Sequence, residues 1–432
     1  MEQDNLKKYP NVLIISNDCL SNTENNGKTL ANLFDKYPHE NLAQLYFNPA
    51  KPTIKIRTYY RIMDINVLTA CFKLNKICGE EMFLLESLEE VKNMNLNGIA
   101  ADMPFKNCLK MMRDILWKSN NWKTQFFLEW LDQFNPQKIF FLAGDTGFTY
   151  DICAYISHRY KADVFTFITD DYFMKRRTIS PFFWTRRNYL LKKVNVILTQ
   201  SVKLFTISEE MQLQYKKIFN KESLLIANVE DMSEKRISEI EKDNIIRLVY
   251  VGSLYYGRAD ILEKLSLAIY NYNVKENKNI ELQIYTTQQL STRDISKLNR
   301  NRASRFCGSL DKQQLSLTLN KTDILVFIES FNKKYIEKVQ LSFSTKIPEY
   351  LSLGKPVLAI GPPNIGSMKY LQKCAFCIYK EEEIQTKVED FFENPQYQKE
   401  IGVKCRKQFD ILQHEVMNSE KITDLICQIK SI

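Results

Sequence analysis

The sequence predicts an α/β protein built from two Rossmann-like domains, and three observations lead to this prediction. The chain has 432 residues. This is longer than one hydrophobic core usually serves, so two domains of about 200 residues are expected. Short apolar segments alternate with helical patterns along most of the chain, as in parallel sheets that helices cover on both faces. A charged linker near residues 230–244 divides this alternation into two series.

The first predicted domain comprises residues 1–235. It opens with an apolar strand at 11–16, a helix that begins near Lys28, and a second strand at 43–47. Residues 50–105 have no clear period, and we expect an irregular insertion or helices there. Further predicted strands, separated by helical stretches, lie at 138–143, 162–168 and 203–207.

The second predicted domain comprises residues 236–418. Its first strand, 245–251, is closed by Gly252, and a helix is expected over 259–272. Ligands of doubly wound sheets bind outside the carboxyl ends of the strands, so two such sheets facing each other would form a ligand-binding cleft. The remaining predicted strands are 280–285, 305–307, 323–327 and 356–360.

Composition indicates a globular protein of the cytoplasm. Hydrophobic residues make up 44% of the chain and charged residues 26%, as is typical of soluble domains. No apolar run reaches the roughly 18 residues that a membrane span requires, and the polar N-terminus has no signal-peptide pattern. Ten cysteines are scattered along the chain, and with three histidines a Cys/His zinc site is not expected. We therefore predict free thiols in a reducing compartment.

The segment from Ser344 to Gly354 is the most informative part of the sequence. It is predicted to form a helix that opens on Ser344 and Thr345, ends at Gly354 and precedes a buried strand. A helix start offers unpaired N–H groups and partial positive charge, and Lys346 adds a fixed cation. Glu349, one turn later on the same face, can accept from the vicinal hydroxyls of a sugar. Phosphate and diol on one helical turn suggest a nucleotide, although an ordinary capped helix has the same pattern.

This segment also resembles a family signature. Its pattern S-x-K-x-x-E-Y-L-x-x-G-K-P-V, from Ser344 to Val357, is similar to the C-terminal-domain motif of GT-B glycosyltransferases. Family 4 and its relatives in bacterial polysaccharide synthesis are the most similar, and the resemblance extends more thinly over most of the chain. It implies two Rossmann-like domains facing across a cleft, with Glu349 on the ribose and Ser344–Lys346, including Thr345, on the diphosphate. It also implies that the last segment, 419–432, crosses back to the first domain.

The loop after the first strand of the second domain is a further point of resemblance. Gly252 permits close approach of the backbone to a ligand, and Arg258 can present a fixed, bidentate charge to a diphosphate. The loop resembles the family's G-R-L-x-x-x-K-G sequence, with Arg258 at the lysine and Ser253 in place of the usual arginine. Phe306–Leu310 resembles a short family turn near the base, which implies a role for Gly308. Taken alone, the first loop also suits a strand-to-helix turn with a surface arginine.

One departure from the family concerns the donor sugar. Many family 4 enzymes carry two glutamates separated by seven residues, and the first of them contacts the donor sugar. Counting back from Glu349 places Leu341 at that position. Glu329 and Glu337 lie in a polar insertion nearby, and the sequence does not choose between them as substitutes.

In the first domain, Asn22–Thr29 imitates the end of a phosphate-binding P-loop, but the first glycine of that motif is absent. The family resemblance instead matches Gly27 to a Gly-rich loop that lies opposite the donor diphosphate. Asp170 ends a predicted strand and is our candidate for holding acceptor hydroxyls or serving as a base, with a helix N-cap as the alternative. Asp18 and Glu24 are weaker candidates for the same task.

A basic region follows in the first domain of this chain, whose net charge is +9. No acidic residue occurs from Tyr172 to Ser208, and aromatic side chains are interleaved with the arginines and lysines. Basic residues beside tryptophan and phenylalanine suit an anionic bilayer or a phosphate-bearing acceptor. A solvated helix face over core aromatics is the alternative, and the chain has no recognisable nucleic-acid module. The predicted membrane or acceptor residues are Arg176, Arg177, Trp184, Arg186 and Arg187.

The resemblance implies a glycosyltransferase that uses a nucleotide-diphosphate sugar. Its acceptor would be a lipid-linked glycan of cell-surface polysaccharide synthesis at the inner face of the cytoplasmic membrane. The sugar would be transferred with retention of its anomeric configuration. Arg258 and Lys346 would stabilise the leaving diphosphate, and Asp170 is the third candidate catalytic residue. Because these cations can neutralise a diphosphate without Mg²⁺, we expect no metal or other cofactor. The alternatives are a sugar-nucleotide epimerase and a catalytically inactive GT-B scaffold at the membrane.

Overall fold

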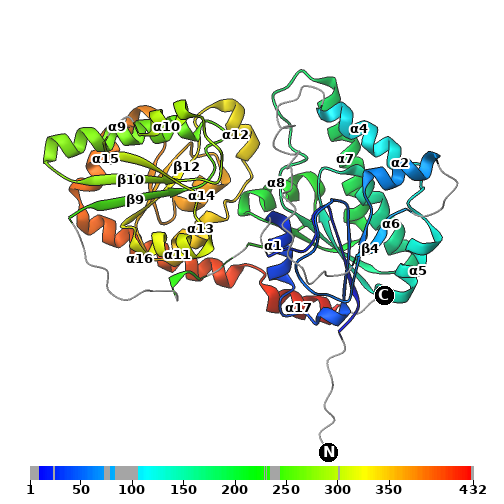
Figure 1. The fold of residues 1–432 in the computed structure, drawn as a ribbon. Coiled ribbons are helices and arrows are strands. Elements are labelled where there is room, and N and C mark those ends of the chain that lie inside the picture. Colours follow the sequence, from blue (N-terminus) through cyan, green and yellow to red (C-terminus); the bar gives the residue numbers. More distant parts are fainter. Residues whose placement is uncertain are drawn as a thin grey trace, which may run out of the picture. The chain divides into compact units, whose positions relative to one another are not determined.

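The computed structural model describes residues 9–22, 25–72, 78–82, 106–227, 229, 231–233, 244–299 and 302–429. The chain divides into two compact units, whose elements are labelled in Figure 1. Unit 1 comprises residues 1–226 and 417–432, and unit 2 comprises residues 227–416. Each unit has one sheet packed with helices, which confirms the predicted α/β class with two Rossmann-like sheets. Most of the predicted linker at 230–244 lies outside the described residues.

The sheet of unit 1 has eight described strands. They are β1 (Val12–Ser16), β2 (Leu42–Tyr46), β3 (Thr58–Arg61), β4 (Glu80–Met82), β5 (Lys138–Ala143), β6 (Asp163–Ile168), β7 (Ser201–Thr206) and β8 (Ser223–Leu225). Their order in the sheet is β4-β3-β2-β1-β5-β6-β7-β8. All neighbours are parallel except β3 and β4 at one edge. The chain direction across the sheet reverses between β1 and β5, which is the switch point where such sheets bind ligands.

The helices of unit 1 alternate with these strands, as the sequence predicts. Thr124 and Ser208 cap two of them, because their hydroxyls accept from Phe127 N–H at 3.3 Å and Met211 N–H at 3.0 Å. The helices before the linker are α1 (Asn25–Leu33), α2 (Asp64–Phe72), α4 (Lys106–Trp117), α5 (Gln125–Phe134), α6 (Gly147–Tyr160), α7 (Pro181–Gln200), α8 (Glu209–Phe219) and a 3₁₀ turn at His39–Asn41.

Two strands in residues 50–105 correct the sequence analysis, which expected only an irregular insertion or helices there. β3 and β4 are short and carry polar residues, so they lack the continuous apolar run by which strands such as β1 and β5 were predicted. The aromatic rings of Tyr59 and Tyr60 are nevertheless buried, and their hydroxyls donate to Ile54 O at 2.5 Å and Cys78 O at 3.1 Å. Residues 83–105 lie outside the described part of the chain.

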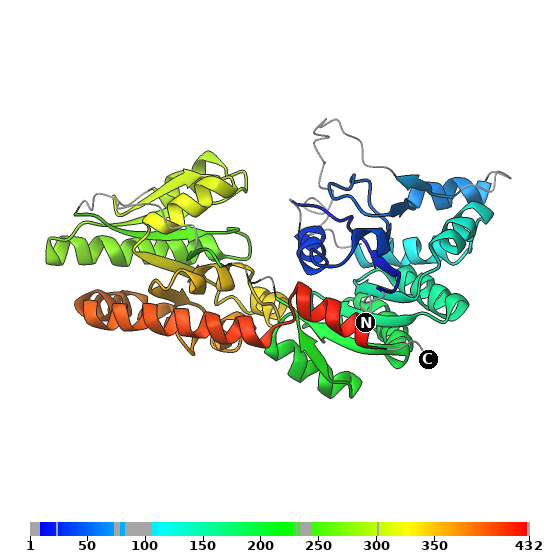
Figure 2. The same cartoon turned by 90° about the horizontal axis from the view of Figure 1, so that it is seen from below.

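A helix from the far end of the chain completes unit 1. This helix, α17 (Ser419–Gln428), is drawn in red in Figure 2 and packs on α1. Ile422 and Ile426 are fully buried in the same core as Phe140 of β5. The buried ammonium of Lys138 donates to Ile429 O at 2.7 Å and so closes the end of the helix. The core of unit 1 is therefore assembled from both ends of the chain.

The sheet of unit 2 has six strands among the described residues, and these are all parallel. They are β9 (Ile246–Val251), β10 (Ile280–Tyr285), β11 (Ser304–Gly308), β12 (Ile324–Ile328), β13 (Val357–Ile360) and β14 (Phe376–Ile378). Their order is β11-β10-β9-β12-β13-β14, so the direction reverses between β9 and β12. The two central strands are therefore the expected edges of a ligand site.

The helices of unit 2 include a short one at the Ser344–Gly354 segment, as predicted. It ends at Ser352, two residues before Gly354, whose φ of +62° lies in the left-handed region that glycine adopts without strain. The helices are α9 (Arg258–Glu276), α10 (Thr292–Leu298), α11 (Lys312–Lys321), α12 (Lys333–Val339), α13 (Lys346–Ser352), α14 (Gly366–Leu371), α15 (Ile384–Glu393), α16 (Pro395–Glu415) and a 3₁₀ turn at Glu381–Glu383.

Candidate functional site

A cavity of about 230 Å³ opens at the carboxyl edge of the sheet of unit 2. β9 and β12 both end at this cavity, and α13 begins beside it. This is the switch point of the sheet, where a doubly wound fold is expected to hold its ligand. The lining residues are Tyr250–Ser253, Arg258, Val326–Glu329, Ser344–Lys346 and Tyr350.

The loop after β9 is held in a defined shape beside the cavity. The hydroxyl of Tyr250 donates to Ser253 O at 2.6 Å across the turn. Gly257 then adopts a left-handed φ of +76°, and a Cβ there would lie 2.8 Å from Ser330 Oγ. Glycine adopts this backbone conformation without strain and leaves room for the Ser330 hydroxyl. As a result, α9 starts at Arg258 and places this residue at the cavity.

Arg258 forms a bidentate ion pair with Glu329, the residue that directly follows β12. Its Nε lies 3.1 Å from Oε2, and its Nη2 lies 2.9 Å from both carboxylate oxygens. Burial raises the pKa of the Glu329 carboxyl, and the guanidinium opposes that rise. Burial also disfavours the Arg258 cation, but the carboxylate outweighs this and raises the pKa of Arg258. The bidentate geometry is that of a charged pair.

The start of α13 forms another wall of the cavity. Ser344 Oγ accepts from Lys346 N–H at 3.3 Å, and Ser344 N–H donates to Ser367 Oγ at 3.2 Å. The Lys346 ammonium pairs with the Glu349 carboxylate at 2.9 Å, and both side chains are half-buried. Tyr350 is fully buried, and its hydroxyl accepts from Val251 N–H at 3.2 Å, which ties α13 to the end of β9.

The structure brings together many of the residues that the sequence proposed as nucleotide-binding. Glu349 does not line the cavity itself but is joined to it through Lys346. Gly308 ends the edge strand β11 and is not among the lining residues. The predicted residues that line the cavity are Gly252, Ser253, Arg258, Ser344, Thr345 and Lys346.

The other predicted site residues belong to unit 1. Gly27 packs so closely against the loop after β1 that a Cβ would lie 2.2 Å from Cys19 O. Asp170 follows β6, is exposed, and accepts from Asp171 N–H at 2.8 Å. Asp18 follows β1 and accepts from Asn26 and Asn48. The fourth candidate, Glu24, lies outside the described residues.

The structure corrects the assignment of Arg186 to the membrane or acceptor surface. Arg186 is 4% exposed, and its Nη1 pairs with buried Asp114 at 2.8 Å. The Nη2 of Arg186 donates to the backbone oxygen of Asp145. A cation held in this way joins α7 to α4 and cannot reach a bilayer.

The remaining predicted residues of the basic region differ in what they contact. Arg176 donates to Asp171 O at 2.9 Å, and Arg187 donates to Phe173 O at 2.6 Å. Burial lowers the pKa of Arg187. Trp184 is half-buried and donates to Thr178 O at 3.0 Å. Arg177 is exposed.

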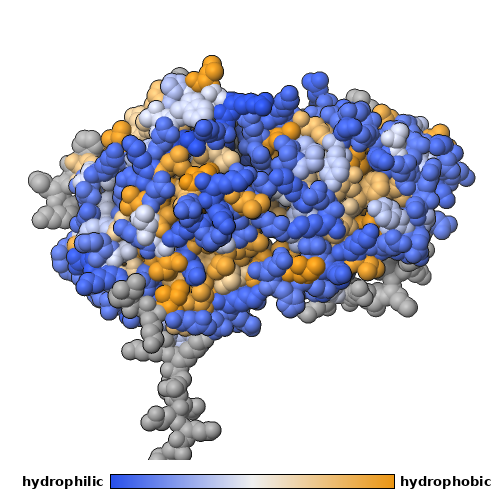
Figure 3. Space-filling view, turned by 180° about the vertical axis from the view of Figure 1, so that it is seen from behind, coloured by the Kyte–Doolittle hydropathy of each residue, from blue (hydrophilic) through white to orange (hydrophobic). Residues whose placement is uncertain are grey.

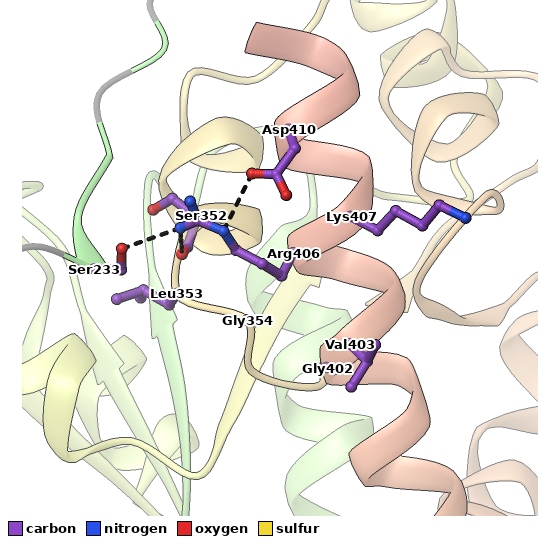
Figure 4. Close-up of a pocket in the computed structure, with 9 residues that line it drawn as sticks. All are labelled: Ser233, Ser352, Leu353, Gly354, Gly402, Val403, Arg406, Lys407 and Asp410. Carbon is purple, nitrogen blue, oxygen red and sulfur yellow. Dashed lines mark hydrogen bonds and ion pairs between the residues drawn. The ribbon is translucent and has the colours of Figure 1, made fainter.

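A second, larger cavity of about 680 Å³ lies at the other end of α13 (Figure 4). Its central side chain is Arg406 of α16, which donates to Ser352 O at 2.7 Å and Ser233 Oγ at 3.0 Å. Arg406 also pairs with Asp231 at 2.8 Å and with Asp410 at 3.2 Å. Because these acceptors already satisfy the guanidinium, we do not assign this larger cavity to a ligand.

The comparisons with known proteins support one conclusion about the fold. No protein-family model and no curated protein matches the chain by sequence. Sucrose-phosphate synthase from Thermosynechococcus elongatus is similar in structure, with a TM-score of 0.57 and 11% identity over 96% of this chain and 97% of that chain. Anabaena Alr3699/HepE in complex with UDP gives a TM-score of 0.57 and 11% identity over 96% and 98%.

A third similar structure is from E. coli and is described as trehalose-6-phosphate bound with UDP-2-fluoro glucose. It gives a TM-score of 0.61 and 8% identity, over 97% of this chain and 99% of that chain. The fold is that of the GT-B glycosyltransferases. The predicted GT-B architecture is thus confirmed, whereas membership of family 4 stays a prediction.

Two residues of this GT-B chain matter more than the sequence analysis recognised. Glu329 was proposed only as one of two substitutes for a donor-sugar contact, and Tyr350 was given no role. A carboxylate directly after a five-residue apolar strand was the signal for Glu329, because parallel strands end at the ligand edge. The contact of Tyr350 with Val251 of β9 had no sequence signal, since these two residues are far apart in the chain.

The described part of this GT-B chain has neither a cluster of metal ligands nor a membrane-spanning helix. No group of three or more His, Cys, Asp or Glu residues in it is arranged to hold a metal ion. None of its described helices is long and apolar enough to cross a membrane. The ten cysteines, all of which lie in the described ranges, form no disulfide bond.

Proposed function

We propose that the protein transfers a sugar from a nucleotide-diphosphate sugar, which it binds in the cavity at the end of β9. The observation that carries this proposal is the convergence of Arg258 and Lys346 on one cavity at the switch point of a GT-B sheet. Both cations are suited to the charge that develops on a departing diphosphate. The structures of HepE with UDP and of the E. coli protein with UDP-2-fluoro glucose add support by analogy of fold.

The roles within the site follow from the contacts around α13. Lys346 is paired with Glu349, one turn later on the same helix, and both side chains are half-buried. When the donor binds, its diphosphate replaces Glu349 as the partner of the Lys346 ammonium. The released Glu349 carboxylate then accepts hydrogen bonds from the ribose hydroxyls. Glu349 is therefore a binding residue and does not act on the anomeric carbon.

Calorimetric titration with UDP, GDP and their sugars tests the proposal. A Glu349→Ala variant should bind the donor more weakly by about 2–3 kcal/mol, because the ribose hydroxyls are then buried without an acceptor. Arg258→Ala and Lys346→Ala should each lower turnover by about 10²-fold. Their double variant should lose less than the sum of the two effects, since both act on one diphosphate. Absence of binding to every nucleotide would exclude the function, and binding without turnover would favour an inactive scaffold.

A finer part of the proposal concerns the acceptor and its location. We infer a lipid-linked glycan of polysaccharide synthesis, with retention of configuration, and docking of unit 1 on an anionic membrane. Support comes from the exposed segment that precedes and opens α7, where cations and apolar side chains lie within eight positions of each other. Its exposed residues are Lys175, Arg177, Ile179, Pro181 and Phe182.

Vesicle flotation tests the docking. Each basic residue near an anionic surface adds about 1 kcal/mol of attraction, and Ile179 and Phe182 offer apolar anchors. Lys175→Gln with Arg177→Gln should release the protein from phosphatidylserine vesicles in a salt-dependent way. Ile179→Ser with Phe182→Ser should release it at all salt concentrations. Donor binding should be unchanged in both variants, and failure of the wild type to float would refute the docking.

A further inference from the structure

The charges around the donor cavity are balanced before any ligand arrives. Among the described lining residues, the two cations are Arg258 and Lys346, and each contacts a carboxylate. The two pairs differ in how firmly they are held. The Lys346–Glu349 pair joins two long side chains on one helix, with 26% and 20% exposure. The Arg258–Glu329 pair is bidentate, with 16% and 6% exposure.

The backbone of Glu329 is held by the neighbouring strand of the sheet. Its backbone N–H donates to Ile360 O at 2.8 Å, which continues the pairing of β12 with β13. A Cβ at Gly361 would lie 3.0 Å from the Glu329 Cβ, so the backbone of the next strand packs directly against it. These two contacts fix the backbone and Cβ of Glu329 at the end of β12. The side chain is 6% exposed, and its carboxylate lies against the Arg258 guanidinium.

The pair leaves part of Arg258 available to a ligand. Glu329 occupies the Nε and Nη2 atoms of the guanidinium, and none of the hydrogen bonds described above involves Nη1. A diphosphate in the cavity would approach a cation whose charge is already shared with a buried carboxylate. Two anions then compete for one guanidinium, in surroundings of low dielectric where their mutual repulsion is strong.

We propose that Glu329 is a built-in counter-ion of Arg258, which competes with the diphosphate and so sets how tightly the site holds a nucleoside diphosphate. This inference rests on the proposed function and assigns to Glu329 a role other than contact with the donor sugar. A structural role alone predicts weaker binding when Glu329 is changed. A competing counter-ion predicts the opposite, because its removal leaves a desolvated cation that only the ligand neutralises.

The test compares Glu329→Gln with the wild type by calorimetric titration with UDP, GDP and inorganic pyrophosphate. We expect the variant to bind the nucleoside diphosphate that the wild type binds at least tenfold more tightly, and to bind pyrophosphate more tightly as well. Without ligand, the thermal midpoint of the variant should lie below that of the wild type. The increase in thermal midpoint that the ligand causes should be larger in the variant than in the wild type. Glu389→Gln, which removes a surface carboxylate paired with Lys275 in the same unit, is the matched control and should bind like the wild type.

A second variant keeps the test decisive if Glu329→Gln folds poorly. Glu329→Asp retains the charge but draws the carboxylate back by one methylene, and its affinity should lie between those of the wild type and the Gln variant. Equal or weaker binding of UDP or GDP by a folded variant overturns the counter-ion role, while the proposed function stands. A wild type that binds neither nucleotide overturns both.

Discussion

At the scale of single residues, charge pairing decides which side chains are available for chemistry. Arg258 and Arg186 look alike in the sequence, yet one lines a cavity and the other is sealed against Asp114. The sequence identified Arg258 because a family motif and the end of a strand coincide there. It misplaced Arg186 because a run without acidic residues does not reveal a carboxylate on another helix. Glu329 shows the same limit, since its partner is distant in the chain.

Asp231 provides a pH-dependent prediction at this scale. Burial alone would raise the pKa of its carboxyl, but hydrogen bonds from Arg406 and Ser233 outweigh burial and hold the pKa below its usual range. A depressed pKa stabilises the fold above the unfolded value of about 3.9, and this is lost as pH falls through the folded pKa. Asp231→Asn should therefore lower the thermal midpoint at pH 7, by less near pH 3. Asp35→Asn, at an exposed position, is the control and should leave the thermal midpoint nearly unchanged at either pH. A difference between the wild type and Asp231→Asn that grows as the pH falls would contradict a depressed pKa of Asp231.

At the scale of elements, the apolar strands at the centre of the unit 1 sheet were predictable, and the polar strands β3 and β4 at its margin were not. β1 and β5 are completely buried, so each is a continuous apolar run in the sequence. β3 and β4 pair at the margin of the sheet, where polar residues are tolerated, and their sequences carry no such signal. The start of α13 was found because capping residues and a following glycine are local features. Its attachment to β9 through Tyr350 is a tertiary contact that no local pattern encodes.

The packing of α7 on α4 yields the second prediction. Asp114 of α4 accepts from Arg186 and also from Gly147 N–H at 2.9 Å and Phe148 N–H at 3.3 Å at the start of α6. Arg186→Gln leaves a buried carboxylate without its cation and should destabilise unit 1 by about 3–5 kcal/mol. Urea unfolding followed by tryptophan fluorescence measures this loss. The exposed Arg177→Gln is the control, and an equal effect of the two changes would refute the buried pair.

At the scale of the whole molecule, the second unit is inserted into the first. Unit 1 comprises segments on both sides of residues 227–416, and α17 supplies two fully buried isoleucines to its core. The sequence suggested this return through the family resemblance alone. Hydrophobic periodicity reveals that a helix has an apolar face, but it does not say which sheet that face meets.

The third prediction tests this division of the core. Ile426→Ala removes a fully buried side chain and should destabilise unit 1 by about 2–4 kcal/mol through lost burial and a residual cavity. Unit 2 should keep its affinity for the nucleotide, because its cavity is lined entirely by its own residues. Differential scanning calorimetry with and without nucleotide distinguishes the unfolding transition of unit 1 from that of unit 2. Ile411→Ala, on the surface of α16, is the control. A uniform loss in both units would contradict the assignment of α17.

The return of α17 has a consequence for the order in which the protein forms on the ribosome. Residues 227–416 must all be translated before α17 exists, so the sheet of unit 1 is synthesised long before its last packing partner. Unit 2 is complete within one continuous segment and can fold without waiting. The first unit to be translated is thus the second to be finished, and the core residues that α17 covers stay accessible to chaperones during that interval.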